Sequence, residues 1–333
     1  RDVLGSRGLG DVYKRQEIND LLESLSAQTC RDFEVIIVED GSTEPCGDLV
    51  RSFAGKVDVR YFYKPNEGRS IARNYGIDRS SGDYLVFFDS DCVIPRDYFA
   101  ILSAELDRQP LDCFGGPDAA HESFTPVQKA ISFAMTSFLT TGGIRGGKVQ
   151  MEKFVPRSFN MGYSRKVYDT VGGFREMFSE DIDMSTRIRQ AGFSIGLIHP
   201  AHVFHKRRVD FARFWRQVYV FGMSRITLKL LYPDSLKLVH TLPALAVIIG
   251  VLLVLLGIFV TPWFLLPIGI YLLAIFLSAW IATRSLGIAL RAVPASVVQI
   301  CGYGCGFIKA FFTKIILRRG RNIEEEIKIR KGK

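Results

Sequence analysis

The sequence has few cysteines, and they follow no regular spacing. Six cysteines occur among 333 residues, without the repeated framework spacing of a disulfide-rich secreted domain or a zinc finger. We expect free cytosolic thiols, with disulfides as the alternative. No recognisable nucleic-acid module accompanies the net charge of +9, so we expect no nucleic-acid partner. Nucleotide phosphates and a membrane surface explain the basic charge better.

Charged side chains are absent from one long segment. The 46 residues 238–283 contain no Asp, Glu, Lys or Arg, and Thr261-Pro262 divides them near the middle. Two spans, about 240–260 and 263–283, are long enough to cross a bilayer core of about 30 Å. A buried hairpin of a soluble protein is the alternative. A third apolar segment, about 292–312, has a marginal length for a span.

Basic residues flank the two predicted spans on one side of the membrane. They are Arg225, Lys229 and Lys237 before the first span and Arg284 and Arg291 after the second. The positive-inside rule therefore predicts a multi-pass membrane protein with its N-terminal domain in the cytoplasm. The third segment is then re-entrant or interfacial. Residues 210–237 have an amphipathic pattern, which predicts a helix lying in the membrane interface or packed on the globular domain.

Two apolar runs end abruptly in carboxylates. Residues 35–38 precede Glu39-Asp40, and residues 84–88 precede Asp89-Ser90-Asp91. Such runs are typical of buried parallel strands, and helical patterns alternate with them, which predicts a doubly wound α/β fold. The carboxyl ends of parallel strands meet at one edge of a sheet, where such folds bind ligands. A divalent cation carrying a phosphorylated ligand would balance the charge of these acids.

Four motifs occur in order along the chain. They are Val38-Glu39-Asp40-Gly41-Ser42, Asn66-Glu67-Gly68-Arg69 with Ala72-Arg73-Asn74, Asp89-Ser90-Asp91, and Glu180-Asp181-Ile182-Asp183. Together they resemble the family 2 glycosyltransferases, which have the GT-A fold, and in particular the membrane-anchored enzymes of bacterial polysaccharide synthesis. The resemblance covers roughly residues 17–230, and the apolar C-terminal third also fits. It implies a Rossmann-like, mostly parallel sheet with helices on both faces, followed by transmembrane helices.

The resemblance also implies roles for the acids at the strand ends. Asp40 would bind the uracil of a nucleotide-sugar, Asp91 would ligate Mg²⁺ or Mn²⁺, and Asp89 would contact the ribose or the metal. Hard oxygen ligands suit those ions. The alternatives are a strand-to-turn junction at Asp40 and a solvated turn at Asp89 and Asp91. We also expect Asn160 to line the sugar pocket.

Two arginines follow Gly68, one helical turn apart. Arg69 and Arg73 are predicted to contact the phosphates of the nucleotide-sugar or the neighbouring acids, with ordinary salt bridges as the alternative. His202 and His205 lie near a predicted late strand, where a metal ligand and an ordinary surface or core histidine are both open interpretations.

The pair Glu180-Asp181 is predicted to act at the acceptor site. Asp181 is our candidate general base, and Glu180 would orient it or bind acceptor hydroxyls. Adjacent carboxylates can raise one another's pKa. The alternative is a helix N-terminus where acids favour the helix dipole.

These predictions describe a metal-dependent inverting glycosyltransferase. It would transfer a sugar from a nucleotide-sugar, implied to be uridine-linked, to a lipid-linked saccharide acceptor at the membrane. Two alternatives remain: a polyprenyl-phosphate glycosyltransferase or processive synthase, and an inactive membrane-tethered sugar-binding scaffold.

The predicted organisation has five parts. Residues 1–16 form an ill-fitting, foreign or truncated start, 17–209 the catalytic domain, 210–237 an interfacial region, 238–317 the transmembrane region and 318–333 a basic tail. Members of the resembled family open with an apolar strand immediately before the first helix. We expect that central strand to be missing here.

Overall fold

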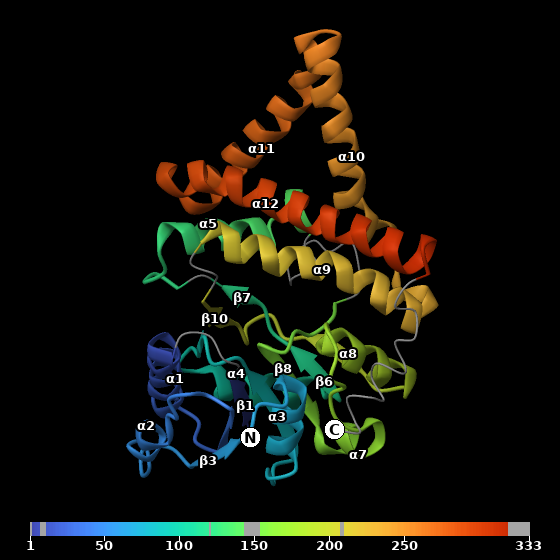
Figure 1. The fold of residues 1–333 in the computed structure, drawn as a ribbon. Helices are drawn as coiled ribbons and strands as arrows, with labels where there is room; N and C mark the ends of the chain where they lie inside the picture. The colour runs from blue at the N-terminus through green and yellow to red at the C-terminus, as the bar shows by residue number, and fades with distance from the viewer. Residues whose placement is uncertain (1, 7–10, 120, 143–153, 207–209, 319–333) are drawn as a thin grey trace. The chain divides into compact units, whose positions relative to one another are not determined.

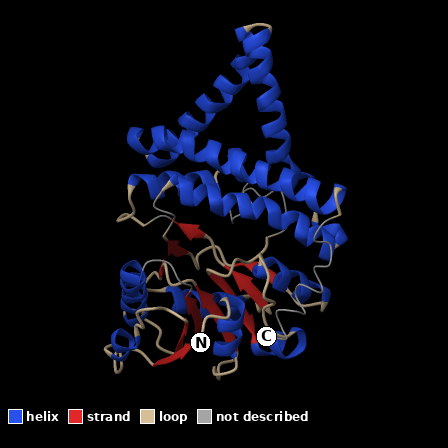
Figure 2. Cartoon of the chain, in the orientation of Figure 1, coloured by secondary structure: helices blue, strands red, loops and turns tan. Residues whose placement is uncertain are grey.

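A computed structural model describes residues 2–6, 11–119, 121–142, 154–206 and 210–318, and the predicted basic tail lies almost entirely outside them. The chain divides into two compact units (Figure 1). The first unit comprises residues 1–121 and 153–206, and the second comprises 122–152 and 207–333. Strands gather in the first unit, whereas the described part of the second is helical (Figure 2).

The first unit is built on a seven-stranded sheet. Its strands, in spatial order, are β3 (Val59–Lys64), β2 (Val35–Asp40), β1 (Asp2–Ser6), β4 (Tyr84–Phe88), β8 (Asn160–Ser164), β6 (Cys113–Gly115) and β9 (Ile195–Leu197). The first four are mutually parallel, β8 is antiparallel to both its neighbours, and β9 runs parallel to β6. This arrangement confirms the predicted, mostly parallel α/β sheet.

Strand β1 occupies the centre of the parallel part, where the sequence predicts a missing strand. Asp2 pairs with both Val35 of β2 and Val86 of β4. A prediction from local pattern fails here because five residues with a polar residue at each end carry no clear strand signal. Pairing with two well-formed neighbours supplies the backbone hydrogen bonds. Whether residues 1–16 are foreign to the protein stays a prediction.

Helices cover both faces of this sheet because the strand residues alternate in direction. On one face, Val86 and Phe88 of β4 pack with the apolar sides of α1 (Asp11–Ser26), α2 (Gly47–Arg51) and α4 (Tyr98–Arg108). On the other face, Leu85 and Phe87 pack with α3 (Arg69–Ile77), α7 (Arg165–Val171) and α8 (Glu180–Gln190). The helices thereby fix the sheet's carboxyl edge between two apolar layers.

A second, three-stranded sheet lies in the same unit. It consists of β5 (Cys92–Val93), β10 (Val203–His205) and β7 (Asp118–Ala119) in that order. β10 pairs antiparallel with β5 and parallel with β7. The short strand β5 follows directly after Asp91, so this small sheet brings a distant part of the chain to the end of β4.

The second unit contains α5 (Pro126–Thr136), α6 (Phe138–Thr141), α9 (Phe211–Leu231), α10 (Leu238–Phe259), α11 (Leu266–Thr283) and α12 (Leu286–Ala310). Short elements η1 (Pro233–Ser235) and η2 (Pro262–Leu265) are 3-10 turns, and η3 (Phe311–Ile316) is a π-helix. α10 and α11 are joined through η2 and diverge from it, and α12 lies beside α9 (Figure 1).

Residues 122–152 group with the helical unit, although the sequence places them inside the catalytic domain. The reason is the apolar face of α5, where Ala130, Ile131 and Ala134 pack with Phe214 and Val218 of α9. Four alanines of the C-terminal helices, Ala279, Ala289, Ala292 and Ala295, complete this core. The apolar face of α9 is thus largely covered within its own unit.

Three helices of the second unit are long and apolar enough to cross a membrane: Leu238–Phe259, Pro262–Thr283 and Leu286–Ile316. Large apolar side chains on the first two are open to the surroundings, including Phe259 and Trp263 at 80% and 77% exposure. A water-soluble helical hairpin would bury such a surface. The lengths of α10 and α11 agree with the two predicted spans.

Candidate functional site

The carboxyl edge of the parallel strands carries the predicted acids. Asp40 is the last residue of β2, and Asp89 follows the last residue of β4, with β1 between these strands. The register therefore places both residues at the same edge of the sheet. The turn at residues 67–68, helix α3 and the start of α8 meet this edge through hydrogen bonds.

The Asp40 carboxylate is enclosed by the chain's own donors. It accepts hydrogen bonds of 2.9 Å from Lys64 Nζ and from the backbone N–H groups of Glu67 and Gly68. Gly68 has a φ of 111°, a region that favours glycine. These contacts agree with the strand-to-turn alternative, in which Asp40 holds the turn that starts α3. A role of Asp40 in binding a base stays a prediction.

Arg73 connects the strand edge with α8. Its guanidinium donates to Asp89 Oδ1 at 2.9 Å and to Glu180 Oε1 at 2.8 Å. Arg73 is almost fully buried, so its role is to connect two acids, and it presents little surface to a ligand. Burial acts to lower the pKa of Arg73, but the charges of Asp89 and Glu180 outweigh it and raise that pKa.

Glu180 is shared by two arginines. Its second oxygen accepts a 2.6 Å hydrogen bond from Arg69, which is one-third exposed and lies over the Phe178 ring. Burial raises the pKa of Glu180, and the positive charges of Arg69 and Arg73 act against that rise. Arg69 is thus the member of this group that has surface available for an anionic ligand.

The Asp181 side chain is more accessible than that of Glu180, at 14% against 2% exposure. Its Oδ2 lies 3.8 Å from Nη1 of Arg157, and its Oδ1 accepts a hydrogen bond from the Ile182 N–H. α8 begins at Glu180, after Ser179 with a φ of 63°, an uncommon conformation for a non-glycine residue. A strained turn therefore separates α8 from the preceding chain.

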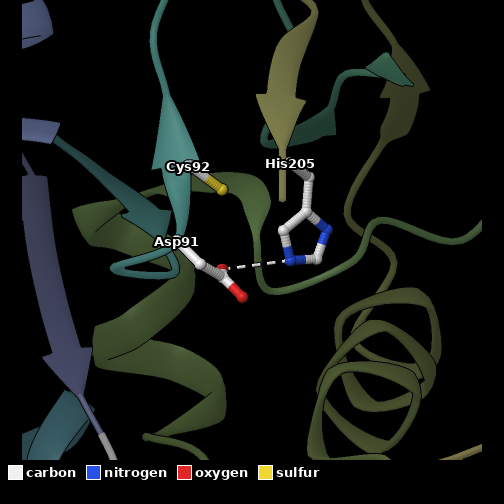
Figure 3. A group of neighbouring side chains, drawn as sticks. All are labelled: Asp91, Cys92 and His205. Carbon is white, nitrogen blue, oxygen red and sulfur yellow. Dashed lines mark ion pairs between the residues drawn. The ribbon is translucent and has the colours of Figure 1, made fainter. Parts of the chain in front are cut away.

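A second group lies just beyond the end of β4. Asp91 Oδ1 is 3.1 Å from Nε2 of His205, and Cys92 lies beside them. The ligand atoms of these three residues lie within 4.8 Å of one another, and their side chains point toward a common point (Figure 3). Carboxylate, imidazole and thiol are all metal ligands, so this donor set fits a divalent cation. Asp89 is not a member of this group and contacts Arg73 instead.

Two further candidates have different surroundings. Asn160 is fully buried, where its amide accepts a hydrogen bond from the Tyr98 hydroxyl and donates one to the Ala201 carbonyl. It supports the small sheet's connection to β8, and its predicted contact with the sugar remains a prediction. His202 lies near the Pro200 carbonyl and does not join Asp91, whereas His205 does.

Sequence reasoning did not single out Arg157, and it assigned no role to Cys92. Arg157 lies in a stretch without clear periodicity, and its proximity to Asp181 comes from a contact across the fold. Cys92 directly follows the Asp89-Ser90-Asp91 motif, and that adjacency was the available signal. Its partner His205 is more than a hundred residues away along the chain, so spacing alone could not pair them.

The strand-edge part of the site, from Asp40 to Asn160, lies in a region that matches a known family. Residues 12–172 match the family model described as "Glycosyl transferase family 2". GlyA, a glycosyltransferase of Streptococcus pneumoniae serotype 4, is 28% identical over 201 residues, which are 60% of this chain and 25% of GlyA. AglE, a glycosyltransferase of Haloferax volcanii, is 25% identical over 259 residues, which cover 72% of this chain and 79% of AglE.

Other relatives are matched over shorter parts. An uncharacterized glycosyltransferase of Rickettsia bellii is 47% identical over 70 residues, 21% of this chain and 10% of that protein. The chain thus spans a small share of some of these relatives. Among solved structures, the mannosyltransferase PcManGT of Pyrobaculum calidifontis aligns with a TM-score of 0.54 and 16% identity, over 94% of this chain and 87% of that one. That likeness shows a shared GT-A fold. Residues 12–172 therefore match a family 2 glycosyltransferase domain, the unit around them has the GT-A fold, and the described part of the chain beyond it includes three long apolar helices.

Proposed function

We propose that the chain is a membrane-bound, inverting glycosyltransferase. It transfers a sugar from a nucleotide-sugar, taken to be uridine-linked, to a lipid-linked saccharide in the synthesis of an exopolysaccharide or cell-surface polysaccharide. The observation that carries this proposal is the Arg73 contact with both Asp89 and Glu180. It joins the strand edge to the start of α8, where Asp181 lies, so that donor-side and acceptor-side acids belong to one rigid group.

Asp181 acts as the general base of this reaction. Its carboxylate is partly exposed, next to the buried Glu180, and takes the proton of the acceptor hydroxyl as that oxygen attacks the anomeric carbon. The nucleoside diphosphate leaves from the opposite face, and the configuration at this carbon is inverted. Glu180 holds Arg69 and Arg73 in place and does not itself need to exchange a proton.

The donor's diphosphate requires positive charge around it. Arg69, which is one-third exposed, is the arginine of the pair placed to contact a phosphate. Asp91 and His205 would hold a divalent cation such as Mg²⁺ or Mn²⁺, which supplies charge neutralisation to the departing diphosphate when bound. Asp89, held by Arg73, is one-third exposed and remains our candidate for contact with the ribose.

The helical unit anchors the enzyme to the membrane where its acceptor lies. α10 and α11 cross the inner membrane, and the positive-inside rule, applied to the flanking arginines and lysines, supports a cytoplasmic glycosyltransferase domain. α12 packs along α9 through close backbone contacts, which favours an interfacial position for this pair. An enzyme on the same surface as its lipid-linked acceptor meets it at a raised local concentration.

The test uses membranes that contain the full chain. They are offered radiolabelled nucleotide-sugars of uridine and guanosine with a lipid-linked saccharide fraction, with and without Mg²⁺ or Mn²⁺. Guanosine donors are included because PcManGT, which shares the fold, was solved with GDP-mannose and Mn²⁺. We expect label in the lipid fraction, and we expect Asp181→Asn to reduce transfer by about 10²–10⁴-fold.

Asp169→Asn is the matched control, because Asp169 is an exposed acid of the same unit on α7. If Asp181→Asn leaves sugar transfer unaffected, Asp181 is not the general base. Nucleotide binding without turnover of any donor would support the inactive scaffold instead. Label on a bare polyprenyl phosphate, or in long chains, would favour the other two enzymatic alternatives. Retention of the donor's anomeric configuration in the product would refute inversion.

A further inference from the structure

The described part of the helical unit is strongly basic. Eleven lysines and arginines occur in residues 122–142 and 210–318, against three acids, Glu122, Asp210 and Asp234. The positive charge of the chain, +9 in total, is therefore concentrated in this unit. A surface with so few acids of its own attracts anionic partners.

α9 and α12 run parallel, so their C-terminal ends lie side by side. A Cβ at Gly306 would meet the Tyr219 carbonyl oxygen, and further along the helices Lys314 donates a 3.0 Å hydrogen bond to the Thr227 hydroxyl. Residue numbers thus rise together along the contact. Lys309 lies over the Tyr219 ring, with its nitrogen 5.8 Å from the ring centroid. The contact therefore brings cations of α12 and η3 to the last turns of α9.

The start of α10 joins the same end of the unit. Leu236 packs with the apolar cluster that contains Ile226 of α9 and Phe307 and Ala310 of α12. Lys237 follows Leu236 and is exposed. Six cations therefore belong to this end, which we call the basic end: Arg225, Lys229, Lys237, Lys309, Lys314 and Arg318.

Exposed apolar side chains lie between these cations. Leu238 is 75% exposed next to Lys237, and Phe312 is 57% exposed in η3, which also carries Lys314. Large apolar groups interleaved with lysines are typical of surfaces that lie between the headgroups and the acyl chains of a bilayer. A nucleic acid would neutralise the cations but would leave Leu238 and Phe312 in water.

The helix dipole offers a competing explanation for the cations. A positive charge near a helix C-terminus is favoured without any ligand, and Lys229 donates to the Pro233 carbonyl oxygen just beyond the end of α9. Lys237 does not fit this explanation, because it immediately precedes the N-terminus of α10, where the dipole disfavours a positive charge. An anion bound at the meeting point of the three helices would offset that cost.

We propose that the basic end binds the headgroup phosphates of anionic glycerophospholipids in the bilayer surface. Lysines and arginines donate charge-assisted hydrogen bonds to phosphate oxygens, and a cluster of this size beside an apolar helix attracts anionic lipid. The exposed Leu238 and Phe312 contact the acyl chains of the same lipids. The inference rests on the membrane placement in the proposed function and does not depend on sugar transfer.

The experiment measures lipid binding by the purified full chain in a non-ionic detergent. Phosphatidylglycerol and phosphatidylcholine with identical acyl chains are titrated separately, and microscale thermophoresis gives the two affinities. We expect phosphatidylglycerol to bind at least about tenfold more tightly. Lys309→Gln/Lys314→Gln should lose most of this preference. Arg213→Gln/Arg284→Gln should keep it, because these exposed cations lie at the start of α9 and just before α12.

A second measurement uses the wild type alone, in case the Lys309 and Lys314 variant does not fold. Raising the NaCl concentration from about 0.05 M to about 0.5 M should remove the preference for phosphatidylglycerol, because salt screens exposed charges. Excess glycerol 3-phosphate should not displace the lipid, because it offers the phosphate without the acyl chains. Displacement by glycerol 3-phosphate would mean a site for soluble anions and would refute the proposal.

Equal affinities for the two lipids in the wild type would also refute it, as would an equal loss of preference in both double variants. If a preference emerges only in Glu324→Gln/Glu325→Gln/Glu326→Gln, the acidic segment of the chain itself occupies the basic end, and lipid does not. These titrations contain no donor or acceptor. A chain that prefers phosphatidylglycerol but transfers no sugar therefore refutes the proposed enzyme and retains this inference, and transfer without any lipid preference does the reverse.

Discussion

The guanidinium of Arg73 donates a 2.8 Å hydrogen bond to Glu180, and both side chains are 2% exposed. The same guanidinium reaches Asp89, so one buried cation serves two acids from different elements. A buried carboxylate without a partner is costly, and Arg69 alone can offset only part of that cost for Glu180. Arg73 is therefore a positioning residue for both ends of the site.

Replacement of Arg73 should destabilise the protein far more than replacement of Arg69. Arg73→Met leaves a buried acid without its main partner, and we expect a loss of about 3–5 kcal/mol in the free energy of unfolding. Arg69→Met removes a partly exposed pair and should cost about 1 kcal/mol or less. Denaturant titration of the two variants in detergent measures the difference. Equal losses would show that Arg73 does not hold the site together.

Transfer kinetics provide a second measurement for Arg73. Arg73→Lys keeps the charge but replaces the planar fork, whose two Nη groups reach Glu180 and Asp89, with a single nitrogen. We expect kcat to fall while the KM for the donor changes little, because Arg73 has almost no surface that a ligand can touch. A rise in KM without a fall in kcat would instead indicate direct contact with the nucleotide-sugar.

Asp40→Asn should lower the stability of the free protein, because the amide cannot accept from all three donors that meet the carboxylate. Replacing one oxygen with an NH₂ group leaves a buried donor unsatisfied, at a cost of about 1–3 kcal/mol. The exposed Asp107→Asn on α4 serves as the control. Calorimetric binding of UDP and of pyrophosphate separates the two roles. Lost affinity for UDP alone would support the predicted contact with the base, whereas an unchanged stability would contradict the structural role.

The free energy of unfolding should fall at acid pH, partly because Glu34 becomes protonated. Burial acts to raise the pKa of Glu34, but hydrogen bonds from Ser81 and Arg60 outweigh it and hold that pKa below its usual value. A carboxyl whose pKa is lowered by folding stabilises the protein above its unfolded pKa, and that contribution is lost as the pH falls through the folded pKa.

Thermal unfolding of the wild type and of Glu34→Gln, measured from about pH 6 down to pH 3, tests this linkage. We expect the wild type to be more stable at pH 6 and the two curves to converge as the pH falls. Curves that stay parallel across the range would show that Glu34 does not contribute through its charge. Glu44→Gln is a suitable control, because Glu44 is exposed in a loop of the same unit.

The sequence predicts the strand ends well and their surroundings poorly. The apolar runs before Asp40 and Asp89 are long enough to identify buried strands, and parallel strands place their ends at one edge. The Arg73 contact with Glu180 follows only once α3 and α8 pack on the same face of the sheet. Short strands such as β5 and β7 carry no periodic signal, so the approach of His205 to Asp91 could not be derived from spacing.

Prediction from local sequence pattern has the same limit in the helical region. Absence of charge identifies α10 and α11, because the whole helix surface is apolar. The covering of α9 by α5 and α12 depends on which apolar faces meet, and the pattern of α9 alone fits a membrane interface equally well. The glycines where α9 and α12 contact each other can be identified only from the three-dimensional structure.

The close approach of α9 and α12 should depend on the glycines at their contact, such as Gly306, and not on glycines away from it. A Cβ at Gly306 would lie 2.0 Å from the Tyr219 carbonyl oxygen, which is impossible without moving the helices apart. We expect Gly306→Ala to lower the free energy of unfolding in detergent by about 1–3 kcal/mol, as overpacking does.

Gly250 is the matched control, because it lies inside the apolar helix α10 with nothing within 4 Å of an added Cβ. Gly250→Ala should leave the stability unchanged or raise it by about 1 kcal/mol, since alanine is the better helix former. Opposite signs for the two variants would locate the helix contact at Gly306. If both variants behave like Gly250→Ala, α9 and α12 do not approach each other as closely in the membrane protein as the backbone contact at Tyr219 requires.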